Sequence, residues 1–589
     1  MVKQPYLSLL LLFCLAISPA IVLAIVILKY SVNVPFLDQW DIANYLIKYY
    51  SQGYLSFSDL IAQHNESRPL FPKIFFIALA SLTDWNVRYE MLFTFLLACL
   101  VSLNIYVISN FTIKGKLNKK LVVISLANLL IFSPIQHDNW LWGIQIITFI
   151  PIACITTCIL IAYSSINLKL KLFISICLST ISTFSYANGM LCWIVVLPVI
   201  ALKNQLSFRK EKGLYILWLG AFLSNLVLYF YGYQKPANHP SFTAALLHPL
   251  KTISFFFAFL GSPLGFKNLI VATIIGVILL FVFIICCIYL FKERKDSLIC
   301  YAAIGWVTIG LYSIISAFIT TLGRVGFGVK EALTSKYTTF SLYLIVSIIY
   351  LAVIIYQDAA NKGYLIKIKF YRKNTVIFAG NLILTFIFLY ILCWDNALGR
   401  MISSQGERLQ GKTCLLFVNI VPEETCLINK LYPSFPKVKE TANQLNRLGL
   451  IQPNLVTSNQ IKQIDKSINM AGQDDKYGWF DSLNNVDKDI YLAAGWARLP
   501  DTGIPADSVV LTYENEKVEA TVFAVADRRI KIKNVAKFAK KKPYSRSGWQ
   551  KYFEASRLPK GLLKLNAWAF DTDTGEAFKI GGTHILENK

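Results

Sequence analysis

The feature that most constrains this chain is a series of apolar runs, each about 20 residues long, over its first 394 residues. The first run extends from about residue 6 to residue 28. A helix needs about 20 consecutive apolar residues to cross a bilayer, so these runs predict membrane spans rather than one large soluble core. The first run is too long for the apolar part of a signal peptide and lacks a clear small-residue cleavage site. We therefore expect it to be retained as the first helix.

Composition agrees with a multi-pass membrane protein. The chain has 589 residues, of which 55% are hydrophobic and 16% are charged, whereas soluble proteins carry about 25% charged residues.

The stretches 70–82 and 253–260 are too short to cross the membrane and are expected to lie along its interface. We expect about eleven transmembrane helices, with approximate limits 6–28, 89–110, 120–133, 143–165, 171–186, 190–202, 213–232, 268–291, 297–320, 339–357 and 376–394.

The net charge of +24 follows the pattern of membrane topology rather than nucleic-acid binding. Cytoplasmic links of membrane proteins are enriched in lysine and arginine, and here the basic residues occupy every second link. This predicts a cytoplasmic N-terminus and no nucleic-acid partner. Because the chain carries no eukaryotic signal, we expect a bacterial inner (plasma) membrane location. The basic links are Lys114 to Lys120, Lys169 and Lys171, Lys203 to Lys212, Lys292 to Lys295, and Lys362 to Lys373.

An odd number of spans would place everything after residue 394 outside the cytoplasm. We expect a helical and loop connector at 395–477 and a β-sandwich domain at 478–589, where the sequence alternates with a period of two. The best strand patterns are 490–497, 508–514 and 562–570. The fold class is thus an all-α polytopic membrane bundle with a C-terminal extracytoplasmic domain. Cys414 and Cys426 are expected to form a disulfide in this oxidising compartment.

The first external loop, at 30–88, carries the residues with the clearest chemical potential. Asp38 and Asp41 are three positions apart and share one face if the stretch is helical. Paired carboxylates act as a general base or hold a divalent metal such as Mg²⁺ or Mn²⁺. The alternative is that they cap the following helix. His64, Glu66 and Arg68 follow in the same loop as candidate substrate-binding residues.

Two later external links supply cations and aromatic rings. Arg324, Lys330 and Lys336 suit a phosphate at the membrane edge, because arginine binds it with two hydrogen bonds; ordinary headgroup contact is the alternative. Trp140 and Tyr337 offer flat faces for a sugar ring, although such residues also anchor helix ends. Neighbouring prolines favour structural roles for His239 and His248. No Walker loop, dinucleotide fingerprint or CxxC pair occurs in the chain, so ATP-driven transport has no support.

The layout of residues 1–394 resembles the GT-C superfamily of integral-membrane glycosyltransferases, which use polyprenyl-phosphate-linked sugars. These enzymes have a cytoplasmic N-terminus, an acidic motif in a large first external loop and often a soluble C-terminal domain. Here Asp38 and Asp41 stand at the place of the acidic motif, spaced as Asp-Gln-Trp-Asp rather than as an adjacent pair. Asn139-Trp-Leu-Trp-Gly143 and Ser335-Lys-Tyr337 also look like segments of bacterial multispan proteins.

The resemblance implies an inverting transfer of a sugar to a cell-envelope glycan or lipid acceptor on the outer face. Asp38 or Asp41 would deprotonate the acceptor hydroxyl, directly or through a bound metal. Arg324, with Lys330 or Lys336, would stabilise the departing phosphate, and the β-domain would position the acceptor.

Two other functions remain open on the sequence. A lipid-linked glycan transporter or flippase would need polar groups at mid-membrane depth, and the apolar runs are almost free of them. A non-enzymatic scaffold for envelope assembly would work through the β-domain and would leave the acidic loop without a role.

Overall fold

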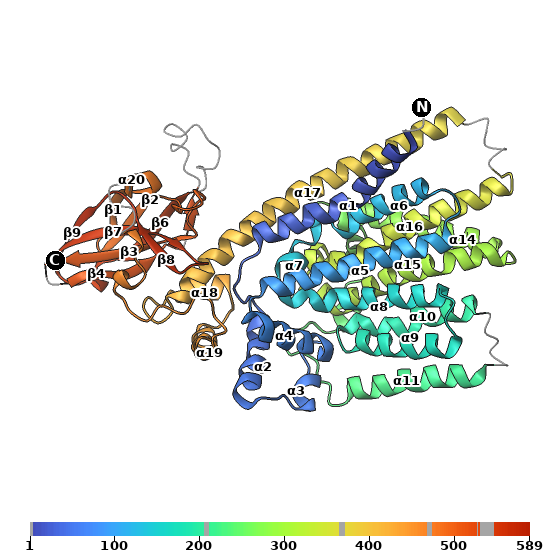
Figure 1. Cartoon of the computed structure of the whole chain (residues 1–589), viewed down its shortest axis with the longest axis horizontal. Coiled ribbons are helices and arrows are strands. Elements are labelled where there is room, and N and C mark those ends of the chain that lie inside the picture. The colour runs from blue at the N-terminus through green and yellow to red at the C-terminus, as the bar shows by residue number, and fades with distance from the viewer. Residues whose placement is uncertain are drawn as a thin grey trace. The chain divides into compact units, whose positions relative to one another are not determined.

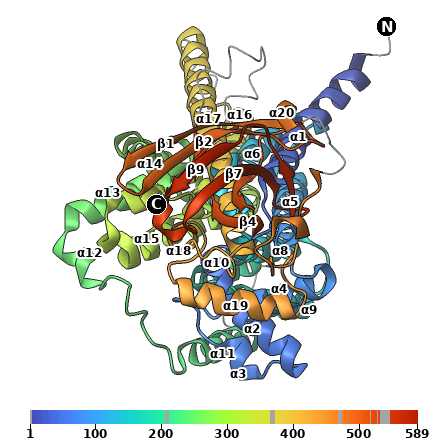
Figure 2. The same cartoon turned by 90° about the vertical axis from the view of Figure 1, so that its left-hand side faces the viewer.

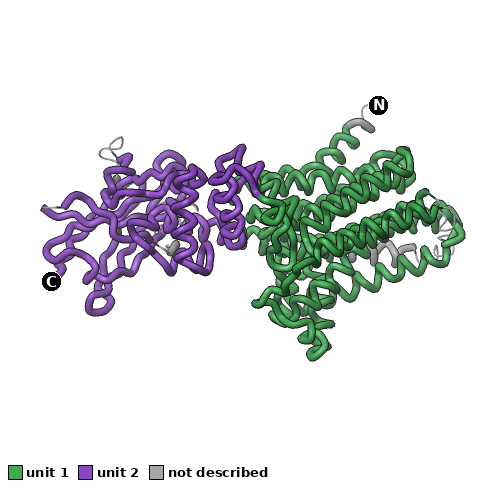
Figure 3. Tube along the Cα trace, turned by 90° about the horizontal axis from the view of Figure 1, so that it is seen from below, with its two compact units in different colours: residues 1–31, 56–76, 89–401 green, residues 32–55, 77–88, 402–589 purple. Residues whose placement is uncertain are grey.

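The computed structural model describes residues 4–204, 211–364, 372–467, 474–516, 518–526, 528–530 and 547–589. The chain divides into two compact units (Figure 3). Unit 1 comprises residues 1–31, 56–76 and 89–401, and unit 2 comprises residues 32–55, 77–88 and 402–589. The loop between the first two long helices therefore contributes to both units. Parts of the basic links at 203–212 and 362–373 lie outside the described residues.

Unit 1 is built from helices that run side by side (Figures 1 and 2). The helices α4 (Leu70–Thr83) and α17 (Arg372–Leu416) contribute several residues to each unit, and α5 (Arg88–Thr112) contributes its first residue, Arg88, to unit 2. The others are α1 (Gln4–Tyr30), α3 (Phe57–Ile61), α6 (Leu117–Ile131), α7 (His137–Leu141), α8 (Ile146–Tyr163), α9 (Leu168–Thr183), α10 (Leu191–Lys203), α11 (Lys212–Phe230), α12 (Thr243–Leu247), α13 (Pro249–Gly261), α14 (Leu269–Lys292), α15 (Ser297–Arg324) and α16 (Ser335–Asn361).

Nine helical segments among the described residues are long and apolar enough to cross a membrane. The chain is thus a multi-pass membrane protein, as predicted. The expected crossings at 171–186 and 190–202 correspond to α9 and α10, which have 16 and 13 residues. The segments that qualify are Leu7–Tyr30, Arg88–Thr112, Leu117–Leu141, Gly143–Tyr163, Lys212–Phe230, Leu269–Lys292, Ser297–Phe327, Ser335–Asn361 and Leu384–Leu416.

Small residues allow close helix packing in unit 1. A Cβ atom added to Gly261 of α13 would lie 1.9 Å from the carbonyl oxygen of Ala272 in α14. A Cβ atom added to Gly276 of α14 would lie 1.9 Å from the carbonyl oxygen of Phe257. Only glycine permits this approach at either position, as is common where membrane helices meet backbone to backbone.

Unit 2 combines short helices with a β-rich region. Its helices are α2 (Gln39–Gln52), α18 (Glu424–Lys430), α19 (Phe435–Arg447) and α20 (Asp474–Tyr477). One antiparallel sheet has the order β1-β2-β6-β5, and the other has the order β4-β3-β7-β8 with β9 also paired to β7. The strands are β1 (Gly478–Asp487), β2 (Ile490–Ala497), β3 (Ser508–Asn515), β4 (Val518–Val525), β5 (Arg528–Ile530), β6 (Gly548–Glu554), β7 (Gly561–Asp571), β8 (Glu576–Lys579) and β9 (His584–Asn588).

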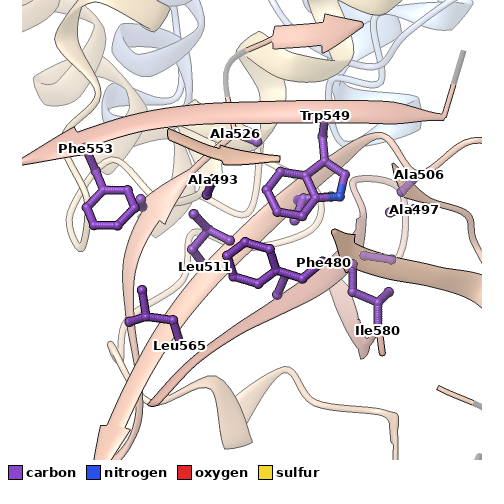
Figure 4. Close-up of a cluster of buried hydrophobic side chains, with 14 of the residues drawn as sticks. Phe480, Ala493, Ala497, Ala506, Leu511, Ala526, Trp549, Phe553, Leu565 and Ile580 are labelled. Carbon is purple, nitrogen blue, oxygen red and sulfur yellow. The ribbon is translucent and has the colours of Figure 1, made fainter. Parts of the chain in front are cut away.

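Strands of both sheets contribute to one hydrophobic cluster (Figure 4). Phe480 of β1 and Trp549 of β6 meet edge to face with ring centroids 5.3 Å apart. Leu511 of β3 and Leu565 of β7 belong to the same cluster. The predicted strands at 490–497, 508–514 and 562–570 are confirmed as β2, β3 and β7. Their inward-facing positions alternate because successive side chains of a strand point to opposite faces.

The connector between the last long helix and the sheets is tied covalently to that helix. Cys414, in the last turn of α17, forms a disulfide with Cys426 of α18. Both cysteines belong to unit 2 and are buried. This is the pairing expected from the sequence.

Candidate functional site

The two aspartates of the acidic motif lie at the start of α2 in unit 2. Asp38 occupies the N-cap position without a side-chain capping hydrogen bond, and Asp41 lies in the first turn. Their carboxylate oxygens come within 4.8 Å of each other. The three-residue spacing thus places both acids on one face, as the helical interpretation predicted. Asp38 does not act as a conventional cap, so capping does not account for the pair.

Asp41 is compensated by a cation from the connector. The Lys437 ammonium of α19 donates a hydrogen bond to Asp41 Oδ1. It also donates to the Tyr432 hydroxyl at 3.0 Å, and that hydroxyl donates to Asp41 at 3.3 Å. Burial disfavours the Lys437 ammonium, but the hydrogen bonds with Asp41 and Tyr432 outweigh it and raise the pKa of Lys437. Lys437 is therefore a fixed hydrogen-bond partner of Asp41.

A second polar cluster lies in unit 1 and joins three links that are far apart in the sequence. We call Glu66, His239 and Arg324 the ionic triad. Arg324 Nη2 donates to Glu66 Oε2 at 2.7 Å, and His239 Nδ1 is hydrogen-bonded to Glu66 Oε1. The same His239 nitrogen lies 3.1 Å from Arg324 Nη1. The side chain of Glu66 is 31% exposed, that of His239 16% and that of Arg324 19%. Most of the triad is therefore shielded from water, but a ligand can still contact it.

Each member of the triad is placed by its own local structure. Arg324 is the last residue of α15, where the helix dipole favours a positive charge. Glu66 belongs to a tight turn closed by two backbone hydrogen bonds between His64 and Ser67. The Tyr229 hydroxyl donates to the backbone carbonyl of Glu66 and thereby links the turn to the end of α11.

Aromatic residues surround the guanidinium of the triad. Tyr186 and Tyr337 are close enough to Arg324 to interact with it electrostatically. The Tyr337 hydroxyl is buried and interacts with the Arg324 guanidinium. A polar group of a ligand bound to Arg324 would therefore also lie near this hydroxyl. The Tyr337 ring stacks on Phe259 at 5.7 Å.

Arg68 serves the fold of this loop rather than a ligand. Its Nε donates to the Tyr229 carbonyl at 2.6 Å and its Nη1 to the Ile61 carbonyl at 3.0 Å, while Nη2 donates to the Tyr231 carbonyl. Three of its five N–H groups are donated to backbone carbonyls and the side chain is buried. The structure therefore favours a positioning role, for the turn that holds Glu66, over the expected contact with substrate.

Lys73 reinforces the same loop from α4. Its ammonium donates to the carbonyl oxygens of Asp59 at 2.8 Å and Ala62 at 2.9 Å. The residue is 1% exposed, and this burial lowers its pKa to about 8, although the charge of Asp59 opposes the shift. Two buried cations thus hold the segment between residues 57 and 68 against the bundle.

The remaining predicted residues are placed as follows. Trp140 is fully buried; its indole donates to the Ser133 carbonyl at 2.9 Å and its ring packs on Phe149. It offers no face to a sugar, which corrects that expectation.

The two lysines of the link after Arg324 lie closer to the surface. Lys330 is exposed. Lys336 pairs loosely with Glu331 at 3.4 Å. Both lysines flank the link that begins at Arg324, so they add positive charge on the same side of the bundle as the triad.

No protein-family model matches this chain, and searches of curated proteins and of solved structures find no match either. The function must therefore be argued from the site itself.

The ionic triad combines two kinds of chemical capability. Because its Nδ1 is hydrogen-bonded to Glu66, His239 has Nε2 as the remaining ring nitrogen for a ligand. Arg324 keeps further N–H groups beyond the one that Glu66 accepts. A desolvated arginine and histidine next to a buried tyrosine hydroxyl form a suitable site for an anion such as a phosphate.

Sequence reasoning discounted His239 and missed Lys437 and Tyr432. The positive-inside pattern predicts that His239 lies on the same side of the membrane as Glu66 and Arg324, and this is the one sequence signal that relates the three residues. Lys437 and Tyr432 lie nearly 400 positions after Asp41. No local pattern in the sequence relates the connector to the first loop.

Proposed function

We propose that this protein is a membrane glycosyltransferase that moves a sugar from a polyprenyl-phosphate donor to an envelope glycan or lipid acceptor. The observation that carries the proposal is the ionic triad. Arg324 and His239 converge on Glu66 beside a buried tyrosine hydroxyl, at the ends of helices that cross the membrane. A lipid phosphate is an anion, and lipid headgroups lie near the ends of membrane-spanning helices. The eleven-crossing topology, the β-sandwich form of the two sheets and a GT-C-like fold are part of the same proposal.

In this proposal the acceptor oxygen attacks the anomeric carbon, the bond to the phosphate oxygen breaks, and the configuration inverts. Negative charge develops on the leaving phosphate, and Arg324 stabilises it, assisted by Lys330 or Lys336. Glu66 and His239 keep the guanidinium in a fixed orientation, which avoids reorganisation during the reaction. Asp38 or Asp41 accepts the proton of the acceptor hydroxyl.

A divalent metal is not required by this assignment. Two carboxylates within 4.8 Å provide oxygen ligands of the kind that Mg²⁺ and Mn²⁺ prefer. However, the Lys437 ammonium already compensates Asp41 and would compete with a cation there. The described contacts fit an acid–lysine pair better than a metal centre, so we assign no step to a metal.

The proposal is tested by comparing envelope and lipid-linked glycans from three strains at equal membrane abundance of the protein. The strains carry the intact gene, no gene, or the double variant Asp38→Asn with Asp41→Asn. We expect the double variant to match the deletion and to lack one sugar residue. Glu554→Gln, an exposed carboxylate in β6, is the control for a loss of charge. A double variant with intact glycans would instead favour transport or scaffolding.

A further inference from the structure

Unit 1 carries an apolar groove between three of its spanning helices. The groove has a volume of about 610 Å³ and runs between α1, α5 and α6. Its walls include Leu10, Phe13 and Ile17 of α1, Tyr106 of α5, and Leu121 and Ile124 of α6. This volume is within the range of ordinary ligand sites, roughly 300–1,000 Å³.

Two polar side chains of the groove are hydrogen-bonded to each other and to the backbone. Ser102 Oγ donates to Asn128 Oδ1 at 2.7 Å, and Asn128 Nδ2 donates to the Ala16 carbonyl at 2.8 Å. Apart from the Tyr106 hydroxyl and the Cys99 thiol, the other lining side chains are hydrocarbon. The occupant that fits such a lining is a hydrocarbon chain.

The α1 wall of the groove is exposed rather than covered by another helix. Leu10 is 58% exposed, Phe13 52% and Ile17 38%. These side chains belong to a segment with the length and hydropathy of a membrane span. An exposed apolar surface on such a helix faces lipid chains in the bilayer. The hydrocarbon that reaches this groove is thus a chain of a membrane lipid.

Positive charge lies at one end of the groove. Leu117, the first residue of α6, is part of the lining and directly follows the basic link from Lys114 to Lys116. Lys116, next to Leu117, is exposed. Lys119 falls on the opposite face of α6 from the lining residues, and Lys120 is held by Asn110 Oδ1 at 3.0 Å. Basic residues at the end of a groove between membrane helices complement an anionic headgroup.

We propose that the α1–α5–α6 groove binds one acyl chain of an anionic phospholipid, with its phosphate held by Lys116. The site is separate from the ionic triad and does not depend on the proposed transferase activity. Its charge complementarity selects the headgroup, and its apolar walls select the chain.

Native mass spectrometry of the full-length protein in detergent tests this assignment, with phosphatidylglycerol and phosphatidylcholine as probes. We expect one phosphatidylglycerol to bind at least about fivefold more tightly than phosphatidylcholine, the preference that even one lysine beside a headgroup provides. Equal binding of the two lipids by the native protein would overturn the proposal.

Two variants separate the headgroup from the chain. Lys116→Glu should remove the preference for phosphatidylglycerol and leave phosphatidylcholine binding unchanged. Ala20→Phe places a ring in the groove lining and should weaken both lipids equally. The controls are Lys169→Glu in another basic link and Ala221→Phe on α11. Unchanged binding in either groove variant, or the same loss in its control, would contradict the site.

Discussion

Arg324 donates a hydrogen bond of 2.7 Å to Glu66 across 258 positions of the chain. The bond connects the end of α15 to the turn that follows α3, and His239 joins it from a third link. An ion pair of this kind, partly desolvated and shared with a histidine, carries a cost that ordinary packing would avoid. Clusters with such charges are candidates for function, and this one supports phosphate binding.

Removing the carboxylate of the triad should reduce both stability and function. In Glu66→Gln, Arg324 and His239 lose their charged acceptor, and we expect the free energy of unfolding to fall by about 1–3 kcal/mol. Thermal unfolding in detergent measures this change. Glu211→Gln, at a helix start without a side-chain capping bond, is the control. An unchanged melting temperature in Glu66→Gln would show that the triad contributes nothing to the fold.

Arg68 should be irreplaceable by lysine, because an ammonium cannot span the three carbonyls that the guanidinium reaches. In Arg68→Lys we expect faster hydrogen exchange in the segment 57–66 and little change in β2 and β3. Exchange followed by mass spectrometry measures both regions in one experiment. Equal protection of the segment in variant and native protein would contradict the positioning role.

The pH dependence of stability should carry a contribution from Lys73. Its folded pKa of about 8 is below the unfolded value of about 10.4, since burial disfavours the charged form. Between these two pH values the unfolded chain binds more protons, so stability rises with pH through this window. The neutral amine still has two N–H donors for Asp59 and Ala62.

The corresponding measurement compares the native protein with Lys73→Met from pH 7 to pH 10. We expect the melting temperature of the native protein to increase relative to the variant above pH 8. If the melting temperature of the native protein relative to that of Lys73→Met stays constant or falls above pH 8, Lys73 titrates near its ordinary value.

The disulfide should stabilise unit 2. Cys414 and Cys426 close a short loop, for which the loss of unfolded-state entropy corresponds to about 3 kcal/mol. We expect Cys414→Ser with Cys426→Ser to unfold at a lower temperature, and a reducing agent to destabilise the native protein but not this variant. Cys177→Ser, an exposed free thiol, is the control. Destabilisation of both proteins by the reductant would show that the effect does not come from this bond.

Local patterns in the sequence predict the elements of this fold well. Hydropathy and period-two alternation depend on neighbours in the chain, so the long apolar runs and the strands at 490–497 and 562–570 could be located directly. The pairing of Cys414 with Cys426 followed from compartment and proximity in sequence. Each of these features depends on residues that lie within a few tens of positions of one another in the chain.

The arrangement of the site was less accessible, because it depends on how distant links meet. The sequence predicts that Glu66 and Arg324 both bind substrate, but nothing in it indicates that they contact each other or His239. The sequence also predicts that Arg68 binds substrate, and only the structure shows that it donates hydrogen bonds to three backbone carbonyls. Trp140 likewise resembled a sugar platform, and only its burial shows that it packs inside the bundle.

The most direct test of Arg324 as the residue that stabilises the departing phosphate is the amount of lipid-linked sugar in cells that carry Arg324→Met. If Arg324 stabilises the departing phosphate, the donor is made but not consumed. We therefore predict accumulation of one polyprenyl-phosphate sugar and loss of the same sugar from the envelope glycans, as in the deletion strain, while Glu554→Gln behaves as the native protein. Wild-type levels of both the donor and the glycans, at equal abundance of the variant in the membrane, would contradict the assignment of this protein as a transferase.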